Sequence, residues 1–152
     1  MRIFYIRKKE NNMKNTNKLL TLALVFVMLF TFAACGAPKA DGIWENAIYL
    51  EDTTLGEGAK TVTVKVTANE KTVTFTIKTD KDILGDALVE HKLIEGEESQ
   101  YGLMVLKVNG MTADYDIDQT YWAFYQNGEY MMSGVDSTAI VGGEEFEIVH
   151  SK

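Results

Sequence analysis

Two stretches that alternate strictly between apolar and polar residues constrain the fold of this chain most. Residues 61–67 and 72–78 each place a branched or aromatic apolar side chain at every second position, with threonine or lysine between them. This period of two gives a β-strand one dry face and one wet face. The gap at 68–70 is short enough for a hairpin. We therefore predict an antiparallel pair whose dry face another element must cover.

The apolar period changes directly after this hairpin. The residues that share one side of a helix are Ile83, Leu84, Ala87, Leu88 and His91. Thr79 and Asp82 have the spacing of a capping pair before such a helix, and His91 and Lys92 suit its negative end. We predict a helix over this segment that lies on the dry face of the hairpin.

Further strands are predicted toward the C-terminus. Asn109-Gly110 and Asn127-Gly128 are strong turn signals, and the strands around them are 103–108, 121–126, 129–132 and 145–150. Residues 43–50 have no clean period and are interpreted as a lead-in strand or a packed arm. This order of elements predicts an α+β domain. Its simplest form is a ubiquitin-like β-grasp, with one helix packed across a mixed, mainly antiparallel sheet.

The N-terminal region has the features of an export signal. Basic residues precede the run 19–34, in which only Thr21 and Thr31 are not apolar, and which is short for a stable membrane span. The run ends in Ala33-Ala34 directly before Cys35. This ending resembles the lipobox of bacterial lipoproteins, which implies cleavage before Cys35 and attachment of lipid, including acyl chains such as palmitate, to that residue.

The chain therefore divides into three predicted parts. Residues 1–34 form a signal peptide, residues 35–42 a lipidated cysteine with its tether, and residues 43–152 the domain. We expect translation to start at Met13 and the domain to lie on the extracellular face of the cell membrane. An ordinary signal peptide with an incidental cysteine, and an uncleaved anchor, remain the alternatives.

Charge excludes several classes of partner. The whole chain has a net charge of −7, and residues 1–34 contribute +5, so the remainder carries −12. A domain this acidic lacks the basic surface that nucleic acids and anionic headgroups require. We expect a monomer that binds no nucleic acid and meets the membrane only through its lipid.

Sequence motifs give little support for an enzyme or a metal centre. Cys35 is the only cysteine, and no nucleophile elbow, phosphate loop or zinc-protease motif is present. Asp114, Asp116 and Asp118 alternate like the start of a calcium loop, but Gln119 and Tyr125 stand where that loop needs glycine and glutamate. We therefore predict neither a catalytic residue nor a metal ligand, and no covalent group beyond the lipid.

Aromatic residues and methionines crowd the predicted hairpin at 121–132. Alternation puts Trp122, Phe124 and Gln126 on one face of the first strand and Tyr121 and Tyr125 on the other. One set should pack on the helix, and the other could stack on a planar ligand. Alternatively, both faces are buried, the second by residues 44–50. The candidate ligand-binding residues, including the neighbouring 109–115 loop, are Tyr121, Trp122, Phe124, Tyr125, Gln126, Tyr130, Met132, Asn109 and Met111.

Short motifs spread over residues 55–150 match those of a known family. They are Leu55-Gly56-Glu57-Gly58, Thr79-Asp80, Leu84-Gly85-Asp86-Ala87-Leu88, Tyr101-Gly102-Leu103, Val108-Asn109-Gly110, Tyr121-Trp122-Ala123-Phe124-Tyr125, Asn127-Gly128, Gly134-Val135 and Gly143-Glu144. Together they resemble the transcobalamin-like C-terminal domain family, whose bacterial members are commonly lipoproteins of this size. The resemblance implies a β-grasp fold and a cobalamin-like ligand.

Two functions follow as hypotheses. In the first, a membrane-anchored extracellular lipoprotein binds a small, corrinoid-like ligand and delivers it to a transporter. In the second, the domain is an envelope module that docks a protein and binds no small molecule, using the edge strands that β-grasp sheets offer.

The lipid prediction is tested by Cys35→Ala. Each methylene of an acyl chain that is buried in the membrane contributes about 0.8 kcal/mol to membrane binding. Loss of the acyl chains should therefore move the protein from the membrane to the soluble fraction without unfolding the domain. Fractionation and circular dichroism measure the two effects. A variant that stays in the membrane would show that the segment before Cys35 is the anchor.

Overall fold

The computed structural model describes residues 42–152, and the predicted hairpin lies at their centre. β2 (Lys60–Ala68) pairs with β3 (Lys71–Thr79) in antiparallel register, as the alternation predicts. Asn69 in the turn has a φ of 53°, in the left-handed region that asparagine tolerates. The predicted signal peptide, Cys35 and all of the tether except Gly42 lie outside the described residues.

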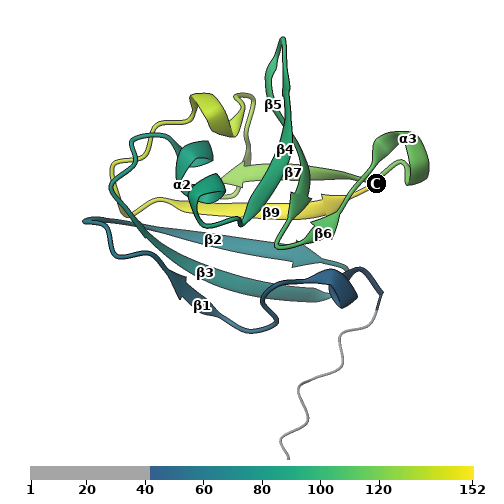
Figure 1. Cartoon of the computed structure of the whole chain (residues 1–152), viewed down its shortest axis with the longest axis horizontal. Helices are drawn as coiled ribbons and strands as arrows, with labels where there is room; N and C mark the ends of the chain where they lie inside the picture. Colours follow the sequence, from purple (N-terminus) through teal and green to yellow (C-terminus); the bar gives the residue numbers. More distant parts are fainter. Residues whose placement is uncertain (1–41) are drawn as a thin grey trace, which may run out of the picture. The chain divides into compact units, whose positions relative to one another are not determined.

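The hairpin belongs to a six-stranded sheet (Figure 1) with the order β1-β3-β2-β9-β7-β8. β1 (Thr53–Leu55) runs parallel to β3, and β9 (Glu145–Ser151) runs parallel to β2 on the other side of the hairpin. β7 (Tyr121–Gln126) is antiparallel to β9, and the short strand β8 (Glu129–Tyr130) forms the far edge. The sheet is therefore mixed, as predicted.

A second, three-stranded sheet has the order β4-β5-β6. It consists of β4 (Ile94–Ser99), β5 (Gly102–Val108) and β6 (Met111–Thr112), all antiparallel. The β4–β5 hairpin projects away from the body of the domain (Figure 1). Sequence analysis does not predict β4, because three of its six residues are glutamate and five of the six are exposed, so no apolar alternation marks it.

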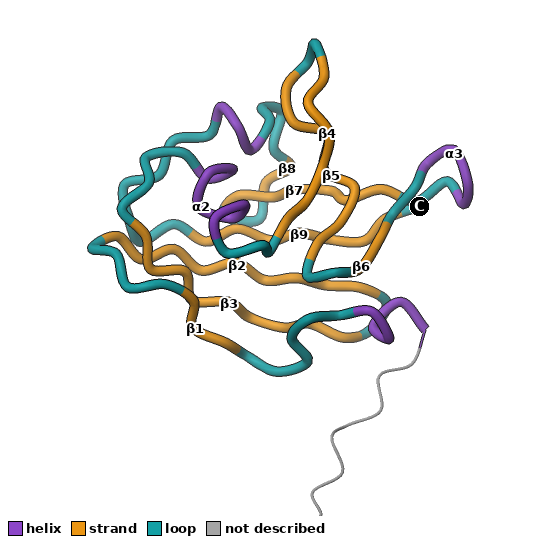
Figure 2. The backbone as a smooth tube through the Cα atoms, viewed as in Figure 1, coloured by secondary structure: helices purple, strands orange, loops and turns teal. Residues whose placement is uncertain are grey.

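The helices are few and short (Figure 2). They are α2 (Leu84–Glu90), α3 (Tyr115–Asp118) and the 3₁₀ turns η1 (Gly42–Asn46) and η2 (Val135–Ser137). With two sheets and these helices, the described residues form an α+β domain. No helix within residues 42–152 combines the length and apolarity needed to cross a membrane.

The predicted capping pair of α2 is wrong. Ile83 occupies the N-cap and makes no side-chain hydrogen bond there. Thr79 accepts a hydrogen bond from the backbone N–H of Lys81, and the Asp82 carboxylate pairs with the Lys60 ammonium. The spacing of a capping box is present in the sequence, but these closer partners take both side chains.

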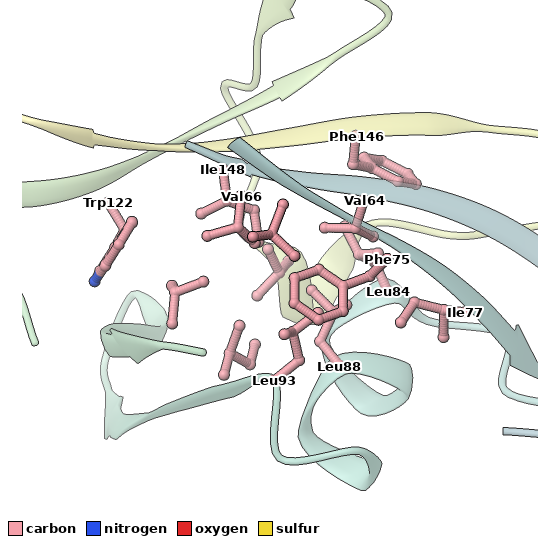
Figure 3. Packing of buried hydrophobic residues seen from close by; sticks show 14 of the residues in the cluster. Val64, Val66, Phe75, Ile77, Leu84, Leu88, Leu93, Trp122, Phe146 and Ile148 are labelled. Carbon is pink, nitrogen blue, oxygen red and sulfur yellow. The ribbon is translucent and has the colours of Figure 1, made fainter. Parts of the chain in front are cut away.

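The core lies on the dry face of the β2–β3 hairpin. Val64, Val66 and Phe75 are fully buried, and Leu84 and Leu88 of α2 pack over them (Figure 3). The helix therefore covers the face that the sequence analysis assigns to it. The opposite face carries Thr61, Thr63, Lys65 and Thr67 of β2 and Thr72, Thr74, Thr76 and Lys78 of β3.

Residues 43–50 form a packed arm, one of the two predicted alternatives. Trp44 is buried, and its indole Nε1–H donates to the Ala68 carbonyl oxygen at 3.0 Å. The Tyr49 ring meets Phe75 edge-on, with centroids 5.7 Å apart. The arm thus packs against the core and the β2–β3 turn, and it leaves Tyr121 exposed on the far face of β7.

The dependence on this core is tested by Phe75→Ala. Removing a fully buried ring leaves a cavity, so the free energy of unfolding should fall by about 3–5 kcal/mol. Thr61→Ala, on the exposed face of β2, is the control and should change it by less than about 1 kcal/mol. Chemical denaturation measures both; equal losses would contradict the assignment of the dry face.

Candidate functional site

A groove of about 330 Å³ lies between the second sheet and the β7–β8 hairpin. The residues that line it come from β5, from β7 and from the segment that runs from β8 into η2. Its lining residues are Leu103, Met104, Val105, Tyr121, Trp122, Phe124, Tyr130, Met131, Met132, Ser133, Gly134 and Val135. The lining includes four aromatic and three methionine side chains and no ionisable acid or base other than tyrosine.

Local pairing explains why these side chains gather. The Asn127-Gly128 turn, with φ values of 51° and 83°, brings Tyr130 opposite Tyr125, and their rings meet edge-on with centroids 5.5 Å apart. The Met131 N–H donates to the Phe124 carbonyl oxygen at 2.9 Å and extends the pairing beyond β8. β5 packs against β7 from the other side. The groove therefore has two walls built from strands.

The exposed fraction of the lining side chains increases from the base of the groove to its rim. Trp122 is 6% exposed and forms part of the core cluster, whereas Tyr130 is 55% and Met132 is 94% exposed. Large apolar side chains that are this exposed mark interaction sites when they are contiguous. The adaptable thioethers of methionine suit such a surface.

Trp122 rests on a histidine. The rings of Trp122 and His150, which are opposite each other in the β7–β9 register, meet edge-on with centroids 5.1 Å apart. Indole Nε1 and imidazole Nε2 are both buried, and neither has a hydrogen-bond partner within residues 42–152. Burial lowers the pKa of His150, and the nearby Asp118 carboxylate offsets part of this effect. Trp122, at the base of the groove, is thus backed by His150, and each ring has a buried nitrogen without a partner among the described residues.

The structure brings together five of the nine predicted site residues. Tyr121, Trp122, Phe124, Tyr130 and Met132 line the groove. The remaining four lie elsewhere: Tyr125 and Gln126 are half-buried on β7 outside the lining, and Asn109 and Met111 are fully buried. Of the two predicted faces of β7, one contributes Trp122 and Phe124 to the lining of the groove and the other contributes Tyr121.

Asn109 and Met111 have structural roles instead of the predicted ligand-binding ones. The Asn109 side chain accepts from the Tyr49 N–H at 2.9 Å and donates to the Tyr49 carbonyl oxygen at 2.8 Å. Its φ of 52° opens the β5–β6 turn. Met111 belongs to the core cluster. The turn predicted at this position is confirmed. The Asn109 side chain, however, binds the backbone of Tyr49 and so attaches the N-terminal arm to the domain.

Sequence reasoning missed the β5 wall of the groove. The apolar segment 103–108 is predicted as a strand, but nothing in its pattern says that Leu103, Met104 and Val105 face β7. Residues 133–135 also escape notice, because they lie in an irregular segment. Only the packing of the second sheet against β7 brings these residues to the site.

The described residues offer no ordinary metal site. Within residues 42–152, no group of three or more histidine, cysteine or acidic side chains could hold a metal ion. Asp114 caps α3 through hydrogen bonds from the N–H groups of Asp116 and Ile117. The first of the alternating aspartates therefore caps a short helix, and the other two lie within it.

Comparisons with known proteins find similarity among solved structures. No family model matches the sequence, and no curated protein matches it. A solved structure of a candidate metal-binding protein from Ruminococcus gnavus ATCC 29149 is similar to it, with a TM-score of 0.58 and 32% sequence identity. The similarity covers 61% of this chain and 97% of that one. The chain belongs to the same family as this Ruminococcus gnavus protein.

Haptocorrin, solved in complex with Cbi, is another similar structure. Its TM-score is 0.47 and its sequence identity 25%. The similarity covers 61% of this chain and 25% of that chain, so this chain spans about a quarter of haptocorrin.

The half-buried His150 predicts how the stability of the domain depends on pH. Because burial holds the pKa of His150 below its ordinary value of 6.5, the unfolded chain binds this proton more readily than the folded chain. The stability from neutral His150 is complete above pH 6.5 and is lost as the pH falls from there toward the folded-state pKa. Thermal unfolding between about pH 7.5 and about pH 5.5 measures this loss.

His150→Phe should remove that acid-induced loss, and His91→Gln should keep it. His91 is the matched control, because it is the other histidine of the chain. An equal loss of stability in the wild type and in His150→Phe would contradict the role assigned to burial of His150.

Proposed function

We propose that this domain captures a corrinoid-like ligand in the groove between β5 and the β7–β8 hairpin, outside the cell and attached to the membrane through lipid on Cys35. The observation that carries the proposal is the lining of the groove, which joins partly exposed aromatic rings to apolar side chains. Ligand sites are concave and mainly apolar, with few polar groups. Five of the nine predicted ligand-binding residues line this groove.

The strand order supports a β-grasp fold of the transcobalamin-like kind. In the central four strands, β3-β2-β9-β7, the last strand of the chain runs parallel to the first strand of the hairpin. α2 follows the hairpin and packs over its dry face. A hairpin, a crossing helix and a last strand parallel to the hairpin are expected of a β-grasp, and they support this part of the proposal.

A corrinoid also agrees with the side chains at hand. Its macrocycle is broad, largely apolar and edged with amides, so aromatic and methionine side chains can contact its rim. The free indole N–H of Trp122 offers a donor at the base of the groove once that ring shifts. Because 330 Å³ is small for such a ligand, we propose that the groove holds one edge of it.

The name of the Ruminococcus gnavus relative is compatible with this proposal. The Ruminococcus gnavus relative is named as a candidate metal-binding protein, yet residues 42–152 offer no cluster of conventional ligands. A corrinoid carries its cobalt already held by the macrocycle. Binding the macrocycle would therefore bring a metal to the domain without a set of protein ligands.

The anchor gives the proposal its cellular setting. Lipid on Cys35 would hold the domain close to the membrane, where a captured ligand can pass to a transporter. The acidic charge of the domain would keep it off anionic headgroups. We propose that the lipid alone makes the membrane contact.

Equilibrium dialysis of the purified full chain against cyanocobalamin and cobinamide tests the proposal. We expect saturable binding of at least one of them at micromolar concentration. Tyr130→Ala should weaken it about threefold to tenfold, because an aromatic contact contributes about 0.5–1.5 kcal/mol beyond its buried area. Tyr115→Ala removes an exposed ring outside the groove and should change it less than about twofold.

Absence of binding at about 500 µM of either corrinoid would end the corrinoid proposal, since a tighter interaction than that is needed for capture. Equal weakening by the two tyrosine variants would move the site away from the groove.

A further inference from the structure

Another groove, of about 670 Å³, runs along β4 between this strand, α2 and η2. β4 contributes residues along most of its length, whereas β5 contributes only Leu103. The lining residues are Gly85, Asp86, Val89, Lys92, Ile94, Glu95, Gly96, Glu98, Leu103 and Asp136. Leu103 also borders the aromatic groove, so the β4–β5 hairpin separates two surfaces of different chemistry.

β4 is an edge strand with an open side. In the order β4-β5-β6 its one neighbour is β5, and within residues 42–152 its backbone makes no hydrogen bond to any other element. The N–H and C=O groups on the free edge can therefore pair with another extended chain. Extended peptides bind in this way when they add a strand to an exposed sheet edge.

The charges that line this groove indicate what kind of peptide it can bind. The acidic side chains on the groove are Asp86, Glu95, Glu98 and Asp136, and they face a single cation, Lys92. Glu95 pairs with Lys107 at 3.4 Å, and the N–H of Leu103 donates to Asp136 at 3.4 Å. Asp86 and Glu98 have no ion-pair partner among the described residues. A basic chain would supply the missing positive charge.

Apolar side chains form the rest of the groove. Ile94 is buried, Leu103 is half-buried, and Val89 of α2 is 47% exposed although it is a large apolar residue. Alternate side chains of an extended peptide point in opposite directions. A peptide that alternates basic and apolar residues can therefore place one set against the carboxylates and the other against this apolar surface.

We propose that the β4 groove docks a basic, extended segment of a partner protein, which pairs with the free edge of β4. This interaction goes beyond ligand capture and uses a different groove. It gives the domain two separate sites, one for a small planar ligand and one for a polypeptide.

NMR titration of the full chain with three blocked hexapeptides tests the proposal. The first alternates lysine and valine, the second alternates glutamate and valine, and the third is the lysine–valine peptide N-methylated at every residue, so that neither of its edges can donate. The first should shift amide signals of Gly96, Glu98 and Val89. The other two should bind at least about tenfold more weakly, because one repels the carboxylates and the other cannot complete the strand pairing.

A matched pair of double variants assigns the charges. Asp86→Asn with Glu98→Gln neutralises the groove and should weaken the lysine–valine peptide about fivefold to tenfold. Asp116→Asn with Glu129→Gln makes the same net change on exposed residues outside the groove and should weaken it less than about twofold. Neither double variant should alter corrinoid binding, so the two proposals can fail separately.

Three results would overturn the proposal: no binding of the lysine–valine peptide at about 1 mM, equal weakening by both double variants, or amide shifts confined to the aromatic groove. Equal binding of the N-methylated peptide would remove the strand pairing and leave only a charged surface.

Discussion

Burial of one face of the β2–β3 hairpin is the constraint on which the rest of this structure depends. Val64, Val66 and Phe75 are fully buried on that face, and each such side chain contributes about 1.5–3 kcal/mol when removed from water. A two-stranded hairpin cannot supply its own cover. α2 covers one part, and the second sheet and the N-terminal arm cover the rest, so every later element is placed by the need to close this surface.

The two grooves arise from how that cover is built. The β4–β5 hairpin reaches beyond the main sheet, so its strands are only partly packed against neighbours (Figure 1). On one side, β5 stands near β7 and leaves aromatic and methionine side chains half-covered. On the other side, β4 keeps a free edge beside α2 and η2. One projecting element therefore separates an aromatic surface from an acidic one.

The two grooves differ in charge, although the domain as a whole is strongly negative. The aromatic groove contains no carboxylate, so a neutral planar ligand meets no charge there. The β4 groove concentrates carboxylates, and it suits a basic chain. The proposed ligand capture and the proposed docking of a partner thus need different residues. Trp122, which lines the first groove, and His150, which contacts the Trp122 ring, belong to β7 and β9 and not to the projecting hairpin.

The sequence by itself determined the local structure wherever a pattern is periodic or a turn needs a special conformation. Alternation placed β2, β3 and β9, the Asn127-Gly128 turn signal placed β7, and the helical period placed α2. Three predicted turns contain an asparagine that the structure places at positive φ. It could not find β4, whose acidic residues form a strand only because β5 pairs with them. The capping pair failed because Lys60 and Lys81 compete for its side chains.

Only the tertiary structure decided which residues share a site. Tyr121, Trp122, Phe124, Tyr130 and Met132 were found from their crowding in one hairpin, whereas Leu103 and Val105 reach the same groove through packing between sheets. Asn109 was predicted as a ligand-binding residue in a loop, but its side chain is buried and forms two hydrogen bonds with the backbone of Tyr49. The physical reason is that a pattern reports which face of an element is apolar, while the distance between two faces depends on how the whole core closes.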